Sequence, residues 1–225
     1  LTKQGSGTLT LSGTSTYTGA TAIDAGTLNL TGSIADSSLT TVASGATLTG
    51  TGTVGDLVIQ ANGILAPGAS PGTLNAGDTT FSSDGIFQFE LNQAGSGVAG
   101  TNWDLLAITG TLTIGATSSD PFVIDVASLT LSNVAGQAAN FNSAASYTFI
   151  FATASGGITG FSADKFYIDT TDFENAFTEA WTVASDGNNL SLNYNVSVIP
   201  EPSTYAALAG LLGLGVVLWH RRRRQ

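Results

Sequence analysis

A serine, a group of carboxylates and a glycine-containing turn are the residues of this sequence that could support chemistry. Gly68-Ala-Ser-Pro-Gly72 has the Gly-x-Ser-x-Gly spacing of a nucleophile elbow, in which a strained turn presents a reactive serine. That chemistry needs a histidine base, and the sequence contains only His220. Pro71 would also interrupt the helix that must follow such a serine. The motif therefore predicts a glycine–proline turn and no catalytic serine.

Two acidic segments are the other candidates. Asp164 with Asp169, or Asp169 with Asp172, could supply the paired carboxylates of glycoside hydrolysis, but nothing in the sequence sets their separation, and Lys165 is the only basic residue beside them. Asp186-Gly-Asn-Asn189 could offer oxygen ligands to calcium. Asp-Gly is equally a strong hairpin signal, which we favour here. We expect no catalytic site, no metal and no cofactor.

The last 28 residues contain three segments of different physical character. A rigid turn of Pro200, Glu201 and Pro202 comes first, and an uncharged apolar run, Tyr205 to Trp219, follows it. As a helix this run would be about 22 Å long, shorter than the roughly 20 residues that usually span a bilayer. We expect a marginal membrane helix over about 204–220. The positive-inside rule places the basic cluster on the cytoplasmic side; it consists of Arg221, Arg222, Arg223 and Arg224.

Small residues lie four apart on this helix. The two pairs are Ala206 with Gly210 and Ala209 with Gly213. Such pairs allow close packing against another membrane helix, and solvation by lipid alone is an equally good interpretation.

The order of these three segments resembles the PEP-CTERM sorting domain of Gram-negative bacteria. The resemblance covers about the last 28 residues. It implies recognition by an exosortase, cleavage near Pro200-Glu201-Pro202, and delivery to the cell surface or an exopolysaccharide matrix. It also implies a precursor anchored in the inner membrane, with membrane lipid around its helix.

Composition and charge limit the class of protein. The chain is 42% hydrophobic and only 10% charged, and it has 28 glycines, which is typical of a repetitive β protein. Before Pro200 there are 15 acidic residues against Lys3 and Lys165, so we expect no nucleic-acid partner. Without cysteine there is no disulfide. The chain opens at Leu1 without a signal peptide, so we expect an export signal and further repeats upstream.

An internal repeat organises the N-terminal part. Gly7-Thr-Leu-Thr-Leu11, Gly26-Thr-Leu-Asn-Leu30 and Gly45-Ala-Thr-Leu-Thr49 begin at intervals of 19 residues. Each later unit reads as strand, tight glycine turn, strand. Alternation puts Leu28 and its equivalents inside and Thr27 and its equivalents outside. A unit of this length fits one coil of a β-solenoid, in which each coil stacks on the last.

Residues 1–32 also resemble the autotransporter-associated β-strand repeat. The resemblance rests on Leu1-Thr-Lys-Gln-Gly-Ser-Gly-Thr-Leu-Thr-Leu11 and the copy that follows it, and on the later turn Gly63-Ile-Leu-Ala-Pro-Gly-Ala-Ser-Pro-Gly72. It implies a right-handed parallel β-helix exposed outside the cell. A translocating barrel, which that family also uses, has no counterpart in this sequence, so we expect no self-translocation.

Beyond Gly85 the period loosens, and we expect wider coils with loops over 93–101 and 135–146. Further strands are predicted at 121–126, 147–152, 165–168, 181–184 and 190–196. Their aromatic residues could cover the open end of the solenoid. Asp172 to Ala180 is the only helical candidate outside the tail, with at most a couple of turns.

The sequence therefore predicts an all-β ectodomain, a right-handed parallel β-helix, followed by one C-terminal transmembrane helix. The expected parts are the repeat at 1–32, continuing solenoid at 33–119, a capping region at 120–197 and the sorting signal at 198–225. The predicted function is that of a non-enzymatic structural protein of the cell surface or extracellular matrix. Two alternatives stay open: an adhesin or carbohydrate-binding protein with exopolysaccharide as partner, and a polysaccharide-degrading β-helix enzyme.

Overall fold

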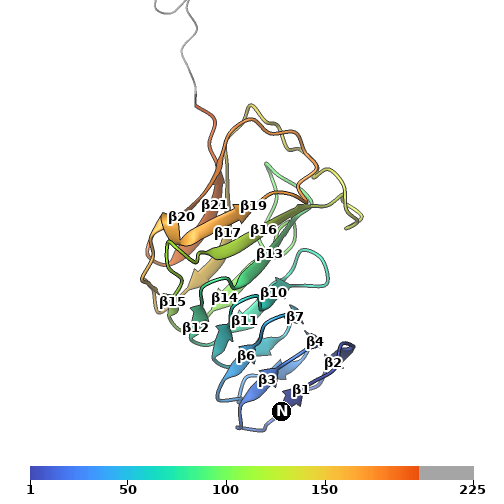
Figure 1. Cartoon of the computed structure of the whole chain (residues 1–225). Coiled ribbons are helices and arrows are strands. Elements are labelled where there is room, and N and C mark those ends of the chain that lie inside the picture. Colours follow the sequence, from blue (N-terminus) through green and yellow to red (C-terminus); the bar gives the residue numbers. More distant parts are fainter. Residues whose placement is uncertain (198–225) are drawn as a thin grey trace, which may run out of the picture. The chain divides into compact units, whose positions relative to one another are not determined.

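The computed structural model describes residues 1–197, and Figure 1 shows them as a stack of parallel strands. The chain divides into two compact units, Leu1–Asn195 and Val196–Gln225. The first unit contains three sheets of seven strands each. Almost all neighbours in these sheets run parallel, which confirms the predicted all-β architecture with parallel sheets. The handedness of the winding and the boundaries at residues 32 and 119 stay predictions.

Each interior coil contributes one strand to each sheet; the first coil has strands only in the first and second sheets, and the third sheet ends in the two strands of a hairpin. The first sheet, in spatial order, contains β1 (Thr2–Lys3), β3 (Thr21–Ile23), β6 (Thr40–Val42), β9 (Leu57–Ile59), β12 (Thr79–Phe81), β15 (Leu112–Ile114) and β18 (Ile158–Thr159). The second contains β2 (Thr8–Leu11), β4 (Gly26–Leu30), β7 (Ala46–Gly50), β10 (Ile64–Pro67), β13 (Ile86–Leu91), β16 (Phe122–Ser128) and β19 (Phe166–Asp169). The third contains β5 (Ser33–Ile34), β8 (Thr53–Val54), β11 (Thr73–Ala76), β14 (Leu105–Ile108), β17 (Tyr147–Ala154), β21 (Asn189–Tyr194) and β20 (Trp181–Ser185).

The coil therefore has three strands where the repeat pattern predicted two. The missed strands, β5 and β8, are two residues long, too short to show an alternation in the sequence. Ser33 nevertheless pairs with Thr53, and Ile34 with Val54, in the same parallel register as the longer strands. Three short strands allow a closed coil from about 19 residues.

Apolar side chains form continuous files through the stack. One file in the second sheet runs through paired positions from coil to coil; it consists of Leu9, Leu28, Leu48, Leu65, Phe87, Ile124 and Ile168. Leu28 and Leu48 are fully buried, whereas Thr27 and Thr47 beside them are half-buried. The predicted facing of leucines inward and threonines outward is confirmed. Leu9 stays half-exposed because no coil lies below β2 among the described residues.

A column of corner residues with positive φ joins the first sheet to the second. It consists of Gly45 (φ 74°), Asn62 (57°) and Asp84 (56°). The Gly45 N–H donates to the Asn62 carbonyl, and the Asn62 N–H to the Asp84 carbonyl. Asparagine and aspartate tolerate this left-handed conformation better than most residues. The predicted corner glycines thus have positive φ at residues 26 and 45, while in the next two coils the residue before the glycine takes that conformation.

The C-terminal end of the stack is closed by an antiparallel hairpin. β21 pairs antiparallel with β17, and β20 pairs antiparallel with β21, so β21 runs against the stack and β20 returns to its direction (Figure 1). Aromatic rings gather at this end, with centroids 5.1–6.4 Å apart in the neighbouring pairs around Trp181 and Phe141. We call this set the aromatic cap; it consists of Phe141, Tyr147, Phe149, Phe173, Phe177, Trp181 and Tyr194. These ring contacts agree with the predicted aromatic cover, whose role as a cap stays a prediction.

The helix predicted over Asp172 to Ala180 is wrong, because this segment is irregular. Its backbone N–H groups donate to side chains of other segments: Glu174 to the Ser128 hydroxyl, and Thr178 and Glu179 to the Tyr194 hydroxyl. These bonds replace the i to i−4 bonds of a helix and place Phe173 and Phe177 against Trp181. In residues 1–197 the only helical turn is the 3-10 turn Ala163–Lys165.

Phe177 offers a moderate test of the cap. Phe177→Ala is expected to lower the free energy of unfolding by about 1–2 kcal/mol, because this ring lies at the rim and is already 36% exposed. Urea titration would measure it. Tyr167→Ala, which removes a 55% exposed ring outside the cap, is the control and should change stability by less than about 0.5 kcal/mol. Equal effects would contradict the assignment of Phe177 to the cap.

Among residues 1–197, no helix is long and apolar enough to cross a membrane. The membrane helix predicted at about 204–220 lies outside the described residues.

Candidate functional site

The residues of the predicted sorting signal lie outside the described part of the chain. They are Pro200, Glu201 and Pro202 of the turn, Ala206, Ala209, Gly210 and Gly213 of the helix, and Arg221, Arg222, Arg223 and Arg224 of the basic cluster. Candidate sites within residues 1–197 can be judged from their geometry.

The Gly68–Gly72 motif forms a turn, as predicted, between β10 and β11. Gly68 has φ 93° and forms bridges to Gly50 and Pro71. A nucleophile elbow would continue into a helix, but here strand β11 begins at Thr73. Ser70 therefore belongs to a connection between two sheets.

The Asp186 turn is also as predicted, since it joins β20 and β21 as a hairpin. One carboxylate oxygen accepts the N–H groups of Asn188 and Asn189, and the other accepts the Asn189 side-chain amide. These bonds, that of the Asn189 side chain foremost, hold the pKa of Asp186 below its usual value. Within residues 1–197 no three His, Cys, Asp or Glu side chains are grouped so that they could hold a metal.

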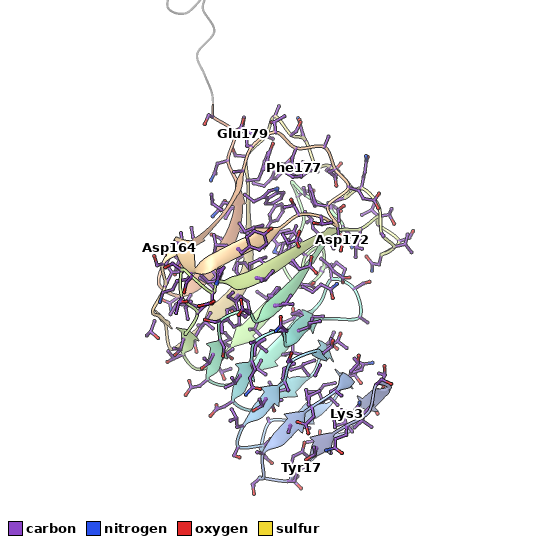
Figure 2. All side chains as sticks on the ribbon, viewed as in Figure 1. Lys3, Tyr17, Asp164, Asp172, Phe177 and Glu179 are labelled. Carbon is purple, nitrogen blue, oxygen red and sulfur yellow. The ribbon has the colours of Figure 1, made fainter. Side chains whose placement is uncertain are left out.

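The two predicted carboxylate pairs, Asp164 with Asp169 and Asp169 with Asp172, share Asp169, the last residue of β19 (Phe166–Asp169), whereas Asp164 and Asp172 lie outside the strand. They flank β19, and Figure 2 shows them at opposite ends of that strand. Asp169 accepts the hydroxyl and N–H of Thr171, and the hydroxyl bond is the larger cause of its lowered pKa. Lys165 donates to the Gly160 carbonyl at 2.8 Å. None of these hydrogen bonds places a basic side chain beside a pair of carboxylates.

A groove of about 520 Å³ lies on the outer face of the second sheet, where β13 and β16 meet the segment after β19. Asp172 marks it in Figure 2. The Ser128 hydroxyl accepts the Glu174 N–H at 2.7 Å, and the Ser128 N–H donates to the Asp172 carbonyl, so this wall is fixed to β16. Its lining is mostly polar; it consists of Gln88, Glu90, Ala127, Ser128, Leu129, Asn133, Ala135, Thr171, Asp172 and Glu174.

The electrostatics of this face are strongly acidic. Burial raises the pKa of Glu90. The pKa of Asp125 is also raised, mainly by burial and further by the charges of Asp172 and Asp169. Both lysines among residues 1–197 donate to backbone carbonyls elsewhere. The groove therefore disfavours anionic ligands.

Two rows of side chains cross the sheet beside the groove. Gln88, Asp125 and Asp169 occupy paired outward positions on β13, β16 and β19. Two residues earlier on each of these strands lies an apolar row, which consists of Ile86, Val123 and the exposed ring of Tyr167. Val123 pairs with each of the other two. Amide and carboxylate oxygens can bond hydroxyl groups, while an exposed ring can stack on an apolar face. The arrangement is suited to binding and contains no nucleophile–base pair.

Asp104 is a buried carboxylate that sequence reasoning missed. It precedes β14, is 1% exposed, and accepts the N–H groups of Gly72 and Glu90 at 2.8 Å each. Burial raises its pKa well above the usual range, and the Glu90 charge raises it further, although both N–H bonds oppose the shift. The residues next to Asp104 in the sequence did not predict its burial, because the N–H groups that it accepts belong to Gly72 and Glu90, which are distant in the chain.

These raised pKa values predict that the protein is more stable in mild acid than at neutral pH. A carboxyl whose folded-state pKa is raised binds more protons in the folded than in the unfolded state. Its stabilising contribution is complete below the ordinary Asp and Glu pKa of about 4 and is lost as pH rises through the raised value. The urea concentration at the midpoint of unfolding should therefore be lower at pH 7.5 than at pH 5.

Asp104→Asn should flatten this pH dependence more than Glu90→Gln does, since Asp104 is the more deeply buried of the two. Asp36→Asn is the control and should leave the slope unchanged, because the Asp36 side chain is exposed. An unaltered slope in Asp104→Asn would contradict the account.

The described residues form a repeat-built parallel β-solenoid with a mostly polar groove on the outer face of its second sheet. Residues 1–30 match the passenger-associated transport repeat, and residues 198–224 match the PEP-CTERM protein-sorting motif. Over 75 residues the chain is 43% identical to an extracellular serine protease of Serratia marcescens, a match covering 33% of this chain and 7% of that protein. The two motifs indicate an exported cell-surface protein. The PEP-CTERM motif is generally associated with processing by an exosortase.

Proposed function

We propose that the chain is a non-enzymatic structural protein of the cell surface or extracellular matrix, delivered there through its C-terminal signal. The match of residues 198–224 to the PEP-CTERM motif is the observation that carries this proposal. The solenoid supports it, since its three sheets offer long outer faces and the aromatic cap closes one end. The word extracellular in the name of the Serratia relative agrees with export.

In this proposal the apolar run 205–219 holds a precursor in the inner membrane, surrounded by lipid. Arg221 to Arg224 stay on the cytoplasmic side, because moving four positive charges across the bilayer is costly. The short length of the run suits a temporary anchor. An exosortase then cleaves near Pro200-Glu201-Pro202, and the solenoid is released to the surface or to an exopolysaccharide matrix.

Replacing Pro200, Glu201 and Pro202 together by alanine tests the sorting step in the native cell. The expected result is that the protein accumulates in the inner-membrane fraction and is lost from the surface fraction. Asn195→Ala, just before the signal, is the matched control and should leave sorting intact. Normal delivery of the triple variant would exclude recognition of this turn.

The groove on the second sheet favours carbohydrate binding as a second candidate function. Its hydroxyl, amide and carboxylate lining, beside the exposed Tyr167 ring, is the chemistry that neutral sugars use. A glycan array probed with the purified full chain in a mild detergent would test it. Gln88→Ala and Tyr167→Ala should each weaken any binding. Tyr17→Ala is the control and should not, because Tyr17 lies away from the groove, in the segment between β2 and β3. A chain that binds no glycan would leave only the structural function.

A further inference from the structure

The sequence contains one Asn-Gly pair, Asn62-Gly63, and it lies at a corner of the solenoid. β9 ends at Ile59 and β10 begins at Ile64, so the pair belongs to the connection between the first and second sheets. Asparagine deamidates fastest when glycine follows it, because glycine has no side chain to hinder the attack of its own backbone nitrogen. The Asn62 side chain is exposed, so water reaches it.

Deamidation at this pair is a reaction of the chain with itself and then with water. The Gly63 backbone nitrogen attacks Cγ of Asn62, so an N–Cγ bond forms and the Cγ–Nδ2 bond breaks. Ammonia leaves with the proton that the Gly63 amide gives up. Water then opens the resulting succinimide ring at either carbonyl, which yields aspartate or isoaspartate. The first step requires that the Gly63 nitrogen be released from any hydrogen bond and face the Asn62 side chain.

The folded corner meets neither requirement. Asn62 has φ 57°, the left-handed conformation, in which ψ is about +30 to +60°. Tetrahedral geometry at Cα then places the Gly63 nitrogen opposite Cβ across the Cα–C bond, away from Cγ. The Gly63 N–H also donates to the Gln60 carbonyl at 2.8 Å, and Gly63 is buried. Attack on Cγ therefore needs a rotation about ψ of Asn62 and the loss of this hydrogen bond.

The neighbouring coils hold the corner in this conformation from both sides. The Asn62 N–H donates to the Asp84 carbonyl at 2.7 Å, and the Asn62 carbonyl accepts the Gly45 N–H at 2.8 Å. The next coil has the same turn, since the Gly85 N–H donates to the Ser82 carbonyl at 3.1 Å. Rotation at Asn62 would therefore break hydrogen bonds to the coil before it and to the coil after it.

We propose that Asn62 is a site of spontaneous deamidation and that the stacking of three coils gates the reaction, so that only an opened coil reacts. The two products differ in their effect on the stack. Aspartate fits the closed corner, because Asp84 has the same conformation in the next coil, with φ 56°. Isoaspartate adds one carbon atom to the main chain and displaces the Gly63 N–H from the Gln60 carbonyl. A transient opening thus becomes a lasting change in the coil.

Peptide mapping by mass spectrometry tests this on the full chain in a mild detergent, incubated at mildly alkaline pH with and without unfolding urea. Asn142, exposed in the loop between β16 and β17 and followed by the small Ser143, is the internal comparison. Conversion of Asn62 should be at least about tenfold slower in the folded chain than in urea, because the reaction waits for opening. Conversion of Asn142 should slow by a smaller factor. An Asn62 rate that is equal in the two states, or slowed no more than that of Asn142, overturns the proposal.

Two cavity variants test whether the gate is local. Ile59 and Ile114 are both buried in one file of the first sheet, joined through Phe81, and Ile59 lies three residues before Asn62. Ile59→Ala should speed the conversion of Asn62 in the absence of urea at least about fivefold over wild type, because each coil depends on its neighbours. Ile114→Ala, two coils further on, is the matched control and should speed it much less. Equal acceleration by the two variants, or none, overturns the local gate.

Discussion

Leu28→Asp is expected to destabilise the solenoid by at least about 4–5 kcal/mol. Leu28 is fully buried in the middle of a file, between Leu9 and Leu48. Removing the side chain of a buried leucine alone costs about 2–5 kcal/mol, and an unpaired buried carboxylate adds several more. Because each coil contacts only its neighbours, the damage should concentrate in the first coils. Urea unfolding with hydrogen exchange would measure both effects.

The matched control is Thr27→Asp, one residue earlier on the same strand. Thr27 points outward and is half-buried, so the new carboxylate can stay in water, and the expected change is within about 0.5–1 kcal/mol. Equal losses in the two variants would contradict the facing of the coil.

Gly50→Val is the second change with a large expected effect, a loss of at least about 3–4 kcal/mol. Gly50 ends β7 with φ 110°, where a β-branched side chain is strained by about 1–3 kcal/mol. A Cβ at this residue would also overlap the Leu30 carbonyl of the coil below, and backbone cannot move aside cheaply. Thermal and urea unfolding should both show the loss.

Gly13→Val is its control. Gly13 has an ordinary φ, and a Cβ there would meet nothing within 4 Å. Its substitution should change the free energy of unfolding by less than about 1 kcal/mol. If Gly50→Val were as mild as Gly13→Val, the close approach of the two coils at Leu30 would be incorrect.

Much of the fold could be predicted from spacing because a solenoid repeats local information. The interval between Gly7, Gly26 and Gly45 predicted stacking, and the alternation around Leu28 predicted its burial. The Asp186 hairpin was also predictable, since its turn chemistry is contained in four consecutive residues.

What the sequence did not reveal depends on contacts between distant residues. The third strand of the early coils is two residues long, so its existence depends on pairing with the next coil. The segment after Asp172 avoids a helix because Ser128 and Tyr194 take its N–H groups. The groove likewise joins residues from Gln88 to Glu174, and Asp104 joins two segments. No local pattern connects such partners.

Mass spectrometry of the mature C-terminus, on protein recovered from the surface of the native cell, tests the central claim most directly. We expect a chain that ends near Pro200-Glu201-Pro202 and lacks the apolar run and the arginines. Surface protein that still carries Arg221 to Arg224 would contradict it.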